Sequence, residues 1–201
     1  KQNTENVNLL KTKDYNIFSV LQIQSKEVLI CRMIADLLNP RGQHGAGAEY
    51  LKIFLRDCLG MEKMDTKLAD QAIVTAEYAI DDERRIDIVI EIGSYFLPIE
   101  VKIYAADQKS QCFDYYQYAK RRDAQAKVYY LTLDGHRPGK DSTSSGSQSV
   151  PEEDIVCLSF REHILNWLKA CKNCGNTGMI PILEQFIRNI EQISGYTSER
   201  V

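Results

Sequence analysis

The sequence predicts an α/β fold in which helices flank a mixed central β-sheet. Two observations lead to this prediction. Apolar residues recur at helical spacing in residues 26–38, 48–60, 161–171 and 180–194, and β-rich runs occupy residues 72–80, 84–103, 127–135 and 154–160. Helices and strands therefore alternate along the chain, an order typical of a sheet covered by helices rather than of a helical bundle or a β-sandwich.

Length and composition indicate one soluble globular domain over residues 1–201, with a polar, flexible lead-in at residues 1–14. The chain is 44% hydrophobic and 26% charged, which argues against a disordered or fibrous protein. Its net charge of -3 argues against a surface that is basic throughout, so any contact with a polyanion must be local. No apolar run is long enough for a membrane span or a signal peptide, and the six cysteines are scattered. We therefore expect a reduced, cytoplasmic protein without a membrane partner.

The predicted helix at residues 26–38 contains a carboxylate in an unusual place. Ser25 is a suitable N-cap, and Asn39-Pro40 ends the apolar periodicity. Glu27 precedes Cys31 and Leu38 by four and eleven residues, so its side chain lies on or beside the buried stripe. The next helix, 48–60, ends at Gly60.

The second half of the chain is predicted to contain a buried strand, a loop and a polar helix. Residues 127–135 fit a fully buried strand, whereas residues 136–153 are rich in Ser, Gly and Pro, lack an apolar pattern and are expected to form a mobile loop. The helix predicted at residues 106–122 would place Gln108 and Gln111 on one face, followed by Tyr115.

Residues 84–103, "RRIDIVIEIGSYFLPIEVKI", predict a β-hairpin that brings two carboxylates together. If Gly93-Ser94 is a type II′ turn, counting outward pairs Val89 with Pro98 and Asp87 with Glu100. Opposed carboxylates repel, and a divalent cation such as Mg²⁺ would compensate for their charge. Lys102 points to the same face as Glu100 because strand residues alternate.

Two observations weaken this interpretation. Pro98 cannot donate to a ladder and suggests an edge strand or a bulge, which would slip the register and turn Asp87 away. An exposed hairpin with a solvated, charged face would show the same spacing, so a structural or interaction domain is an alternative. The polar residues on neighbouring elements, Glu27, Gln108, Gln111 and Tyr115, favour a functional site instead.

This set of motifs resembles the PD-(D/E)xK nuclease superfamily, the restriction-endonuclease-like phosphodiesterases, and more closely a bacterial and phage branch of it. The shared pieces are Glu27 with "IADLLNP", His44-Gly45, Arg85 to Ile88, Glu100 to Ile103, and Asp107-Gln108 with Gln111 and Tyr115. Ile86 stands where the motif is named for a proline. Together the pieces span residues 16 to 118.

The resemblance implies a restriction-endonuclease-like core and a metal-dependent hydrolysis of DNA by metal-activated water. It implies that Asp87, Glu100 and the Val101 carbonyl bind Mg²⁺, which Mn²⁺ would replace, and that Glu27 binds the metal or a water on it. Lys102 would orient the attacking water. The residues expected to contact the substrate are Gln108, Gln111, Tyr115, Lys109 and Arg85.

DNA is the expected partner, and a homodimer or a larger defence or repair complex is the expected assembly. The alternative within the same fold is a nucleic-acid-binding or regulatory module that does not cleave.

Overall fold

The computed structural model describes residues 15–62, 64–174 and 176–195, so the predicted lead-in at 1–14 lies outside the described residues. Among the described residues, four helices precede the sheet: α2 (Ile17–Val20), α3 (Glu27–Leu38), α4 (Glu49–Asp57) and α5 (Thr66–Ala69). The elements after it are α6 (Gln111–Arg122), α7 (Lys140–Thr143), η1 (Glu152–Asp154), η2 (Phe160–Ile164), α8 (Leu165–Lys172), η3 (Thr177–Met179) and α9 (Ile180–Ser194). None of the described helices is long and apolar enough to cross a membrane.

A mixed five-stranded sheet forms the centre of the described chain, with strand order β1-β2-β3-β4-β7. The strands are β1 (Ile73–Ala79), β2 (Arg85–Ile92), β3 (Tyr95–Lys102), β4 (Val128–Thr132) and β7 (Ile155–Ser159). β1, β2 and β3 pair antiparallel, whereas β3, β4 and β7 run parallel. The predicted α/β class and mixed sheet are confirmed, and β4 is buried along its whole length, as its sequence predicts.

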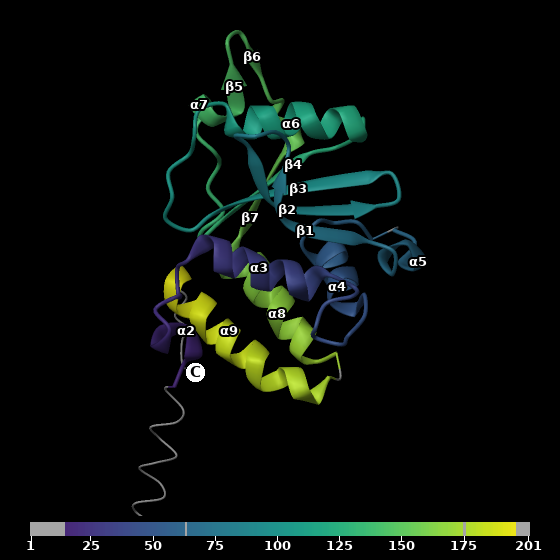
Figure 1. The fold of residues 1–201 in the computed structure, drawn as a ribbon, viewed down its shortest axis with the longest axis vertical. Helices are drawn as coiled ribbons and strands as arrows, with labels where there is room; N and C mark the ends of the chain where they lie inside the picture. Colours follow the sequence, from purple (N-terminus) through teal and green to yellow (C-terminus); the bar gives the residue numbers. More distant parts are fainter. Residues whose placement is uncertain (1–14, 63, 175, 196–201) are drawn as a thin grey trace, which may run out of the picture.

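Helices cover both faces of the sheet (Figure 1). α6 contacts β3 and β4 on one face, where Ile86, Val89 and Tyr115 belong to a smaller core. α3, α4, α8 and α9 form a thicker layer on the other face, around the larger core. Trp167 of α8 is fully buried there, and its Nε1 donates to the Tyr50 carbonyl over 2.8 Å. The sheet is therefore buried between two unequal layers.

The β2–β3 hairpin has the predicted register from Ile92–Tyr95 to Ile88–Ile99, but the ladder ends there, so the predicted pairing of Asp87 with Glu100 is not part of it. Gly93 and Ser94 form the turn, Gly93 has φ +57° and Ser94 does not have a positive φ, as a type II′ turn requires. Val89 pairs with Pro98. Pro98 is not at an edge, because β3 is the middle strand. Its nitrogen faces β4, and the β3–β4 ladder begins only at the next residue, so no ladder bond is lost.

Two helix boundaries differ from the prediction. The N-cap of α3 is Lys26, and no side chain caps the helix, so the predicted Ser25 cap is wrong. The helix expected at residues 106–122 begins at Gln111, after Ser110 with φ +57°. Gln108 is consequently outside the helix and exposed, and it does not share a helical face with Gln111.

The segment 136–153 contains regular elements, although its composition predicts none. α7 is followed by a small hairpin of β5 (Ser144–Ser145) and β6 (Gln148–Ser149), at the end of the molecule beyond α6 (Figure 1). Ser142 Oγ accepts the Cys112 N–H, and the Asp141 carbonyl accepts the Ser110 N–H. The segment is thus attached to the first turn of α6.

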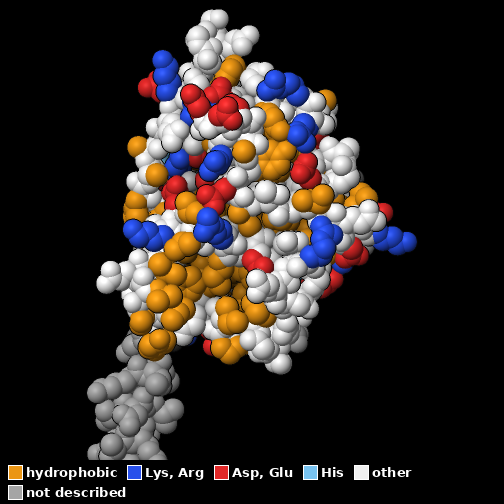
Figure 2. Space-filling view, in the orientation of Figure 1, with side chains coloured by type: hydrophobic (Ala, Val, Ile, Leu, Met, Phe, Trp, Pro, Cys, Tyr) orange, Lys and Arg blue, Asp and Glu red, His pale blue; other side chains and the backbone are white. Residues whose placement is uncertain are grey.

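One part of the surface is apolar. Figure 2 shows hydrophobic side chains gathered at the end of the molecule that carries α2 and the start of α3. The exposed hydrophobic residues of these elements are Ile17, Val20, Leu21, Val28 and Leu29. Val28 and Leu29 directly follow Glu27 in the sequence, at the start of α3.

Candidate active site

The candidate site lies where β2 and β3 separate. Their ladder ends at the pair Ile88–Ile99, and the edge of β3 continues without a β2 backbone partner. Asp87 Oδ2 accepts the Val101 N–H over 2.7 Å, and Glu27 Oε2 accepts the Ile103 N–H over 2.8 Å. Two carboxylates from different elements therefore replace backbone acceptors along this edge, which explains why acids occupy positions where apolar residues would pack.

The Val101 carbonyl lies along the same edge, between these two contacts. The N–H and C=O groups of one strand residue point to the same side, and the Val101 N–H points toward Asp87. The carbonyl precedes the Ile103 N–H that Glu27 accepts. Two carboxylates and one carbonyl therefore line a short stretch of β3.

Glu100 and Lys102 extend from β3 toward α6. Both are buried, with 1% and 7% exposed area, and Lys102 Nζ lies 2.5 Å from Glu100 Oε1. Lys102 and Asp87 both interact with the Glu100 carboxylate, although neither contact has the angles of a regular hydrogen bond. Two buried carboxyl groups that share one ammonium are costly, so the cluster favours a further positive charge.

The electrostatics of the cluster favour a cation. Burial raises the pKa of Glu100 well above its usual value of 4.5, and the neighbouring charge of Asp87 raises it further, against the effect of Lys102. Burial is also the main cause of the raised pKa of Asp87. Burial lowers the pKa of Lys102, but the contact with Glu100 and the charges of Glu100, Asp87 and Glu27 together outweigh it, so its pKa is raised overall. The cluster therefore favours an added positive charge, which either a proton or a metal cation supplies.

The donor set fits a hard divalent cation. Carboxylate and carbonyl oxygens are the ligands that Mg²⁺ takes, usually from one or two carboxylates with the remaining positions left to water or substrate. Within the described ranges, no three His, Cys, Asp or Glu side chains converge tightly enough to hold a metal by themselves. Asp87, Glu100 and the Val101 carbonyl form a smaller set that meets this requirement of Mg²⁺, with unsatisfied oxygens on Glu100.

Gln111 and Tyr115 support the start of β2 from α6. Gln111 Nε2 donates to Tyr115 Oη over 3.0 Å, and Tyr115 Oη donates to the Arg85 carbonyl over 2.5 Å. Both side chains are buried, and Gln111 Oε1 has no partner among the described residues. The charge of Glu100 contributes to the raised pKa of Tyr115, after burial, which places this pair near the site.

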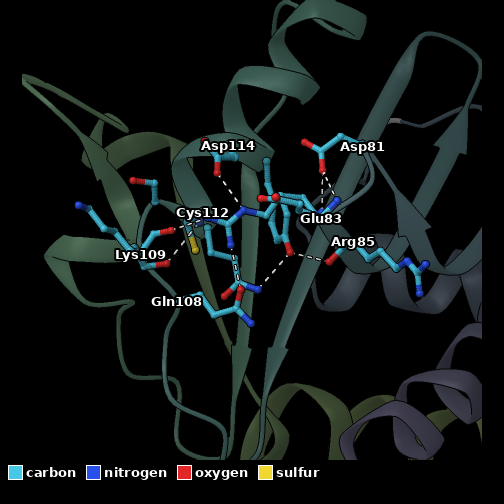
Figure 3. A network of polar contacts seen from close by, with 12 residues as sticks. Asp81, Glu83, Arg85, Gln108, Lys109, Cys112 and Asp114 are labelled. Carbon is cyan, nitrogen blue, oxygen red and sulfur yellow. Dashed lines mark hydrogen bonds and ion pairs between the residues drawn. The ribbon is translucent and has the colours of Figure 1, made fainter.

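Gln108 and Lys109 are not brought to the carboxylates. Arg84 donates to Gln108 Oε1 over 2.9 Å, to the Lys109 carbonyl over 2.6 Å and to Asp114 Oδ2 over 3.0 Å. Figure 3 shows Gln108, Lys109 and Asp114 around these contacts, while the Arg85 side chain extends away from them. No local pattern in the sequence indicates this structural role of Arg84.

His44 is a structural residue of the turn before α4. Its ring is 2% exposed and stacks on Tyr50, Nδ1 accepts the Ala46 N–H, and Nε2 lies 2.9 Å from the Asn39 carbonyl. Both ring nitrogens therefore have partners.

Cys31 lies close to the site, although the sequence analysis did not predict it there. Burial raises the pKa of its thiol, and the charges of Asp87, Glu27 and Glu100 add to the effect.

A comparison with protein families agrees with the motifs and the fold. The profile of the PD-(D/E)XK nuclease superfamily matches residues 15–188, which include the whole sheet and every residue of the candidate site. Nucleases of this superfamily typically use divalent metal ions. Searches of curated proteins and of solved structures found no match. Because the profile covers most of the sequence, the chain belongs to the PD-(D/E)XK nuclease superfamily.

Proposed function

We propose that the protein is a metal-dependent nuclease that hydrolyses phosphodiester bonds in DNA. The observation that carries this proposal is the buried Glu100 carboxylate, which lies against the carboxyl group of Asp87 and shares with it the single ammonium of Lys102. Two acids in such a place favour a divalent cation over a purely structural role. Membership of the nuclease superfamily supports the reaction class.

Asp87, Glu100 and the Val101 carbonyl would hold the Mg²⁺ ion, and Mn²⁺ would replace it. When bound, the ion would lower the pKa of water and neutralise charge on the phosphate. Glu27 holds the Ile103 N–H and thereby fixes the end of β3 against α3. It would also accept a proton from, or orient, a water beside the Val101 carbonyl.

Lys102 would position the attacking water and stabilise the developing negative charge of the phosphate. Its ammonium is held at the site by Glu100, and its raised pKa keeps it charged at neutral pH. A preorganised cation in a site that excludes water is an effective stabiliser of a charged transition state. Lys102 is not a metal ligand in this scheme, so its removal should separate cleavage from metal binding.

The substrate-contact residues divide into two groups. Among the described residues, the side chains of Arg85 and Lys109 have no ion-pair partner and are exposed, so both are available to phosphate groups. Gln111 and Tyr115 are buried and hold the Arg85 carbonyl, so they would act by fixing the start of β2. Gln108 is engaged by Arg84 and would reach DNA only through its free amide nitrogen.

The test is cleavage by the full chain of plasmid, linear duplex, single-stranded, branched DNA and RNA, with Mg²⁺ or Mn²⁺. Lys102→Met should lower the cleavage rate by about 10²-fold or more while Mn²⁺ still binds in calorimetry. Lys67→Met, which removes an exposed lysine from α5, is the matched control and should cleave normally. Cleavage retained in Lys102→Met would contradict the assignment. Mn²⁺ binding without cleavage of any substrate would favour the non-cleaving module.

A further inference from the structure

At Asp87 the side chains of β2 change from one face of the sheet to the other. Ile88, Ile90 and Ile92 belong to the larger core, on the side of α3 and α4, whereas Ile86 belongs to the smaller core beneath α6. Residues two apart in a regular strand share a face. The change of face between Ile86 and Ile88 therefore places Asp87 at the point where the strand rotates.

The side chains of β1 change face in the same way at Glu77. Val74 and Ala76 pack against the larger core, but Tyr78 and Ile80 pack against the smaller one. The register does not slip, since Ala76 pairs with Ile88 and Tyr78 pairs with Ile86. Glu77 is thus opposite Asp87 in register, but this position is missing from the β1–β2 ladder, and both strands change face there.

Glu77 has a backbone conformation that allows this change of face. Its φ is +54°, in the left-handed region that a residue with a Cβ rarely adopts. The other non-glycine residues with positive φ among those described, Gln22 and Ser110, lie outside the strands. Such an outlier persists only where the surrounding structure requires it.

The change of face in β1 and β2 has a direct consequence for the candidate site. The β2–β3 ladder ends at Ile88–Ile99, one residue before the change of face, and Asp87 then reaches sideways to the Val101 N–H. We propose that Glu77 is a positioning residue. Its left-handed backbone makes the side chains of β1 and β2 change face together and so sets the Asp87 carboxylate at the edge of β3. This inference rests on the proposed metal-dependent function.

The side chain of Glu77 has a separate and smaller role. Its Oε2 accepts Arg32 Nε over 3.1 Å and Arg32 Nη2 over 2.6 Å, which links β1 to α3. Both side chains are partly exposed, at 58% for Arg32 and 34% for Glu77, and exposed ion pairs contribute little. The backbone conformation and the ion pair can therefore be tested by different substitutions.

The test compares four substitutions of Glu77 and one of Arg32 in the full chain. Glu77→Gly and Glu77→Asn remove the carboxylate and tolerate a left-handed φ, Glu77→Ala removes the carboxylate but leaves the Cβ that Glu77 already carries, and the β-branched Glu77→Val resists this φ. Arg32→Gln removes only the ion pair and is the matched control for it. We expect Gly, Asn, Ala and the Arg32 variant to bind Mn²⁺ like wild type in calorimetry, and Val to bind about tenfold more weakly or worse, because metal ligands depend on their supporting residues.

Hydrogen exchange at the Val101 amide provides a second readout that needs no metal. It should remain slow in Glu77→Gly and become faster in Glu77→Val, because only the latter displaces the Asp87 acceptor. Equal Mn²⁺ affinity in all variants, or equal loss in Gly and Val, would overturn the inference. If wild type bound no Mn²⁺, the proposed function would fail while the exchange measurement still decided the role of Glu77.

Discussion

Asp87 supports the fold as well as the proposed metal site. Its Oδ2 is the acceptor for the buried Val101 N–H, and its charge lies beside Glu100 and Glu27. Replacing it therefore has two opposing effects on a protein without metal: relief of carboxylate repulsion stabilises the fold, and loss of the acceptor destabilises it. The choice of substituent separates the two.

Asp87→Asn keeps an acceptor oxygen and removes the charge, so it should raise the melting temperature in the presence of a chelator. Asp87→Ala also leaves the Val101 N–H unpaired, which costs about 1–3 kcal/mol, and should melt below Asp87→Asn. Thermal unfolding with EDTA measures both. Neither variant should bind Mn²⁺ as wild type does in calorimetry. An Asn variant that melts clearly below wild type would show that the Asp87 charge is stabilising.

The sequence predicted some site residues and could not predict others, for a physical reason. Asp87, Glu100 and Lys102 follow from a glycine turn and the two-residue period of strands, which are local rules. Glu77 has no such signal, because a left-handed φ is expected of Gly or Asn rather than Glu. The role of Arg84 has no local signal either, since its partner Asp114 is 30 residues away.

At the scale of elements, contacts between residues far apart in the sequence determine where α6 begins and how the Ser- and Gly-rich stretch folds. Composition indicates neither. The start of α6 is delayed to Gln111 because Ser110 is left-handed, its N–H donates to the Asp141 carbonyl, and Arg84 holds the preceding carbonyl of Lys109. The Ser- and Gly-rich stretch after β4 forms α7 and the β5–β6 hairpin against this same turn. These partners come from separate parts of the chain, so no local pattern in the sequence indicates them.

Asp107 is the residue that links the two segments. Its Oδ1 accepts the Tyr130 Oη–H over 2.7 Å, and its Oδ2 accepts the Gly139 N–H over 2.7 Å. Asp107→Ala removes both contacts, each worth about 1–3 kcal/mol for a charged acceptor, and should release residues 136–149. Amide exchange in this segment should accelerate about tenfold or more.

Asp107→Asn, which retains one oxygen acceptor, is the control for the Asp107 prediction and should show an intermediate effect. Tryptic cleavage after Lys140, an exposed residue of α7, provides an independent measurement. Unchanged exchange and cleavage in Asp107→Ala would mean that the Ser110 and Ser142 contacts hold the segment without Asp107.

At the scale of the whole molecule, the sheet explains how the site is assembled. Glu27 comes from the thick helical layer, Lys102 and Glu100 face α6, and Asp87 lies between β2 and β3. The site can collect groups from both layers only because β2 leaves β3 before the end of that strand. Its buried acids therefore couple to the stability of the whole fold, which the fully buried Trp167, the single tryptophan, can report.

This coupling predicts a pH dependence of unfolding with a definite sign. Glu100 and Asp87 have folded-state pKa values above their usual 4.5 and 3.8, so the folded protein binds more protons than the unfolded chain. Without metal, stability should be fully present below those usual values and fall as the pH rises through the raised ones. The pKa values of three other carboxyl groups are lowered, those of Asp57, Asp134 and Asp154. These groups make stability rise with pH, but only below about 3.8, their usual pKa.

The measurement is the melting temperature, followed by Trp167 fluorescence in EDTA, from pH 4.5 upward. Each unit by which a folded-state pKa is raised corresponds to about 1.4 kcal/mol, or roughly 3–6 °C for a chain of this size. Glu100→Gln should flatten the decline, because an amide cannot ionise. With saturating Mn²⁺ the decline in wild type should reverse, since metal and protons compete for the same oxygens. If Glu100→Gln kept the full wild-type slope, another buried group would have to be responsible.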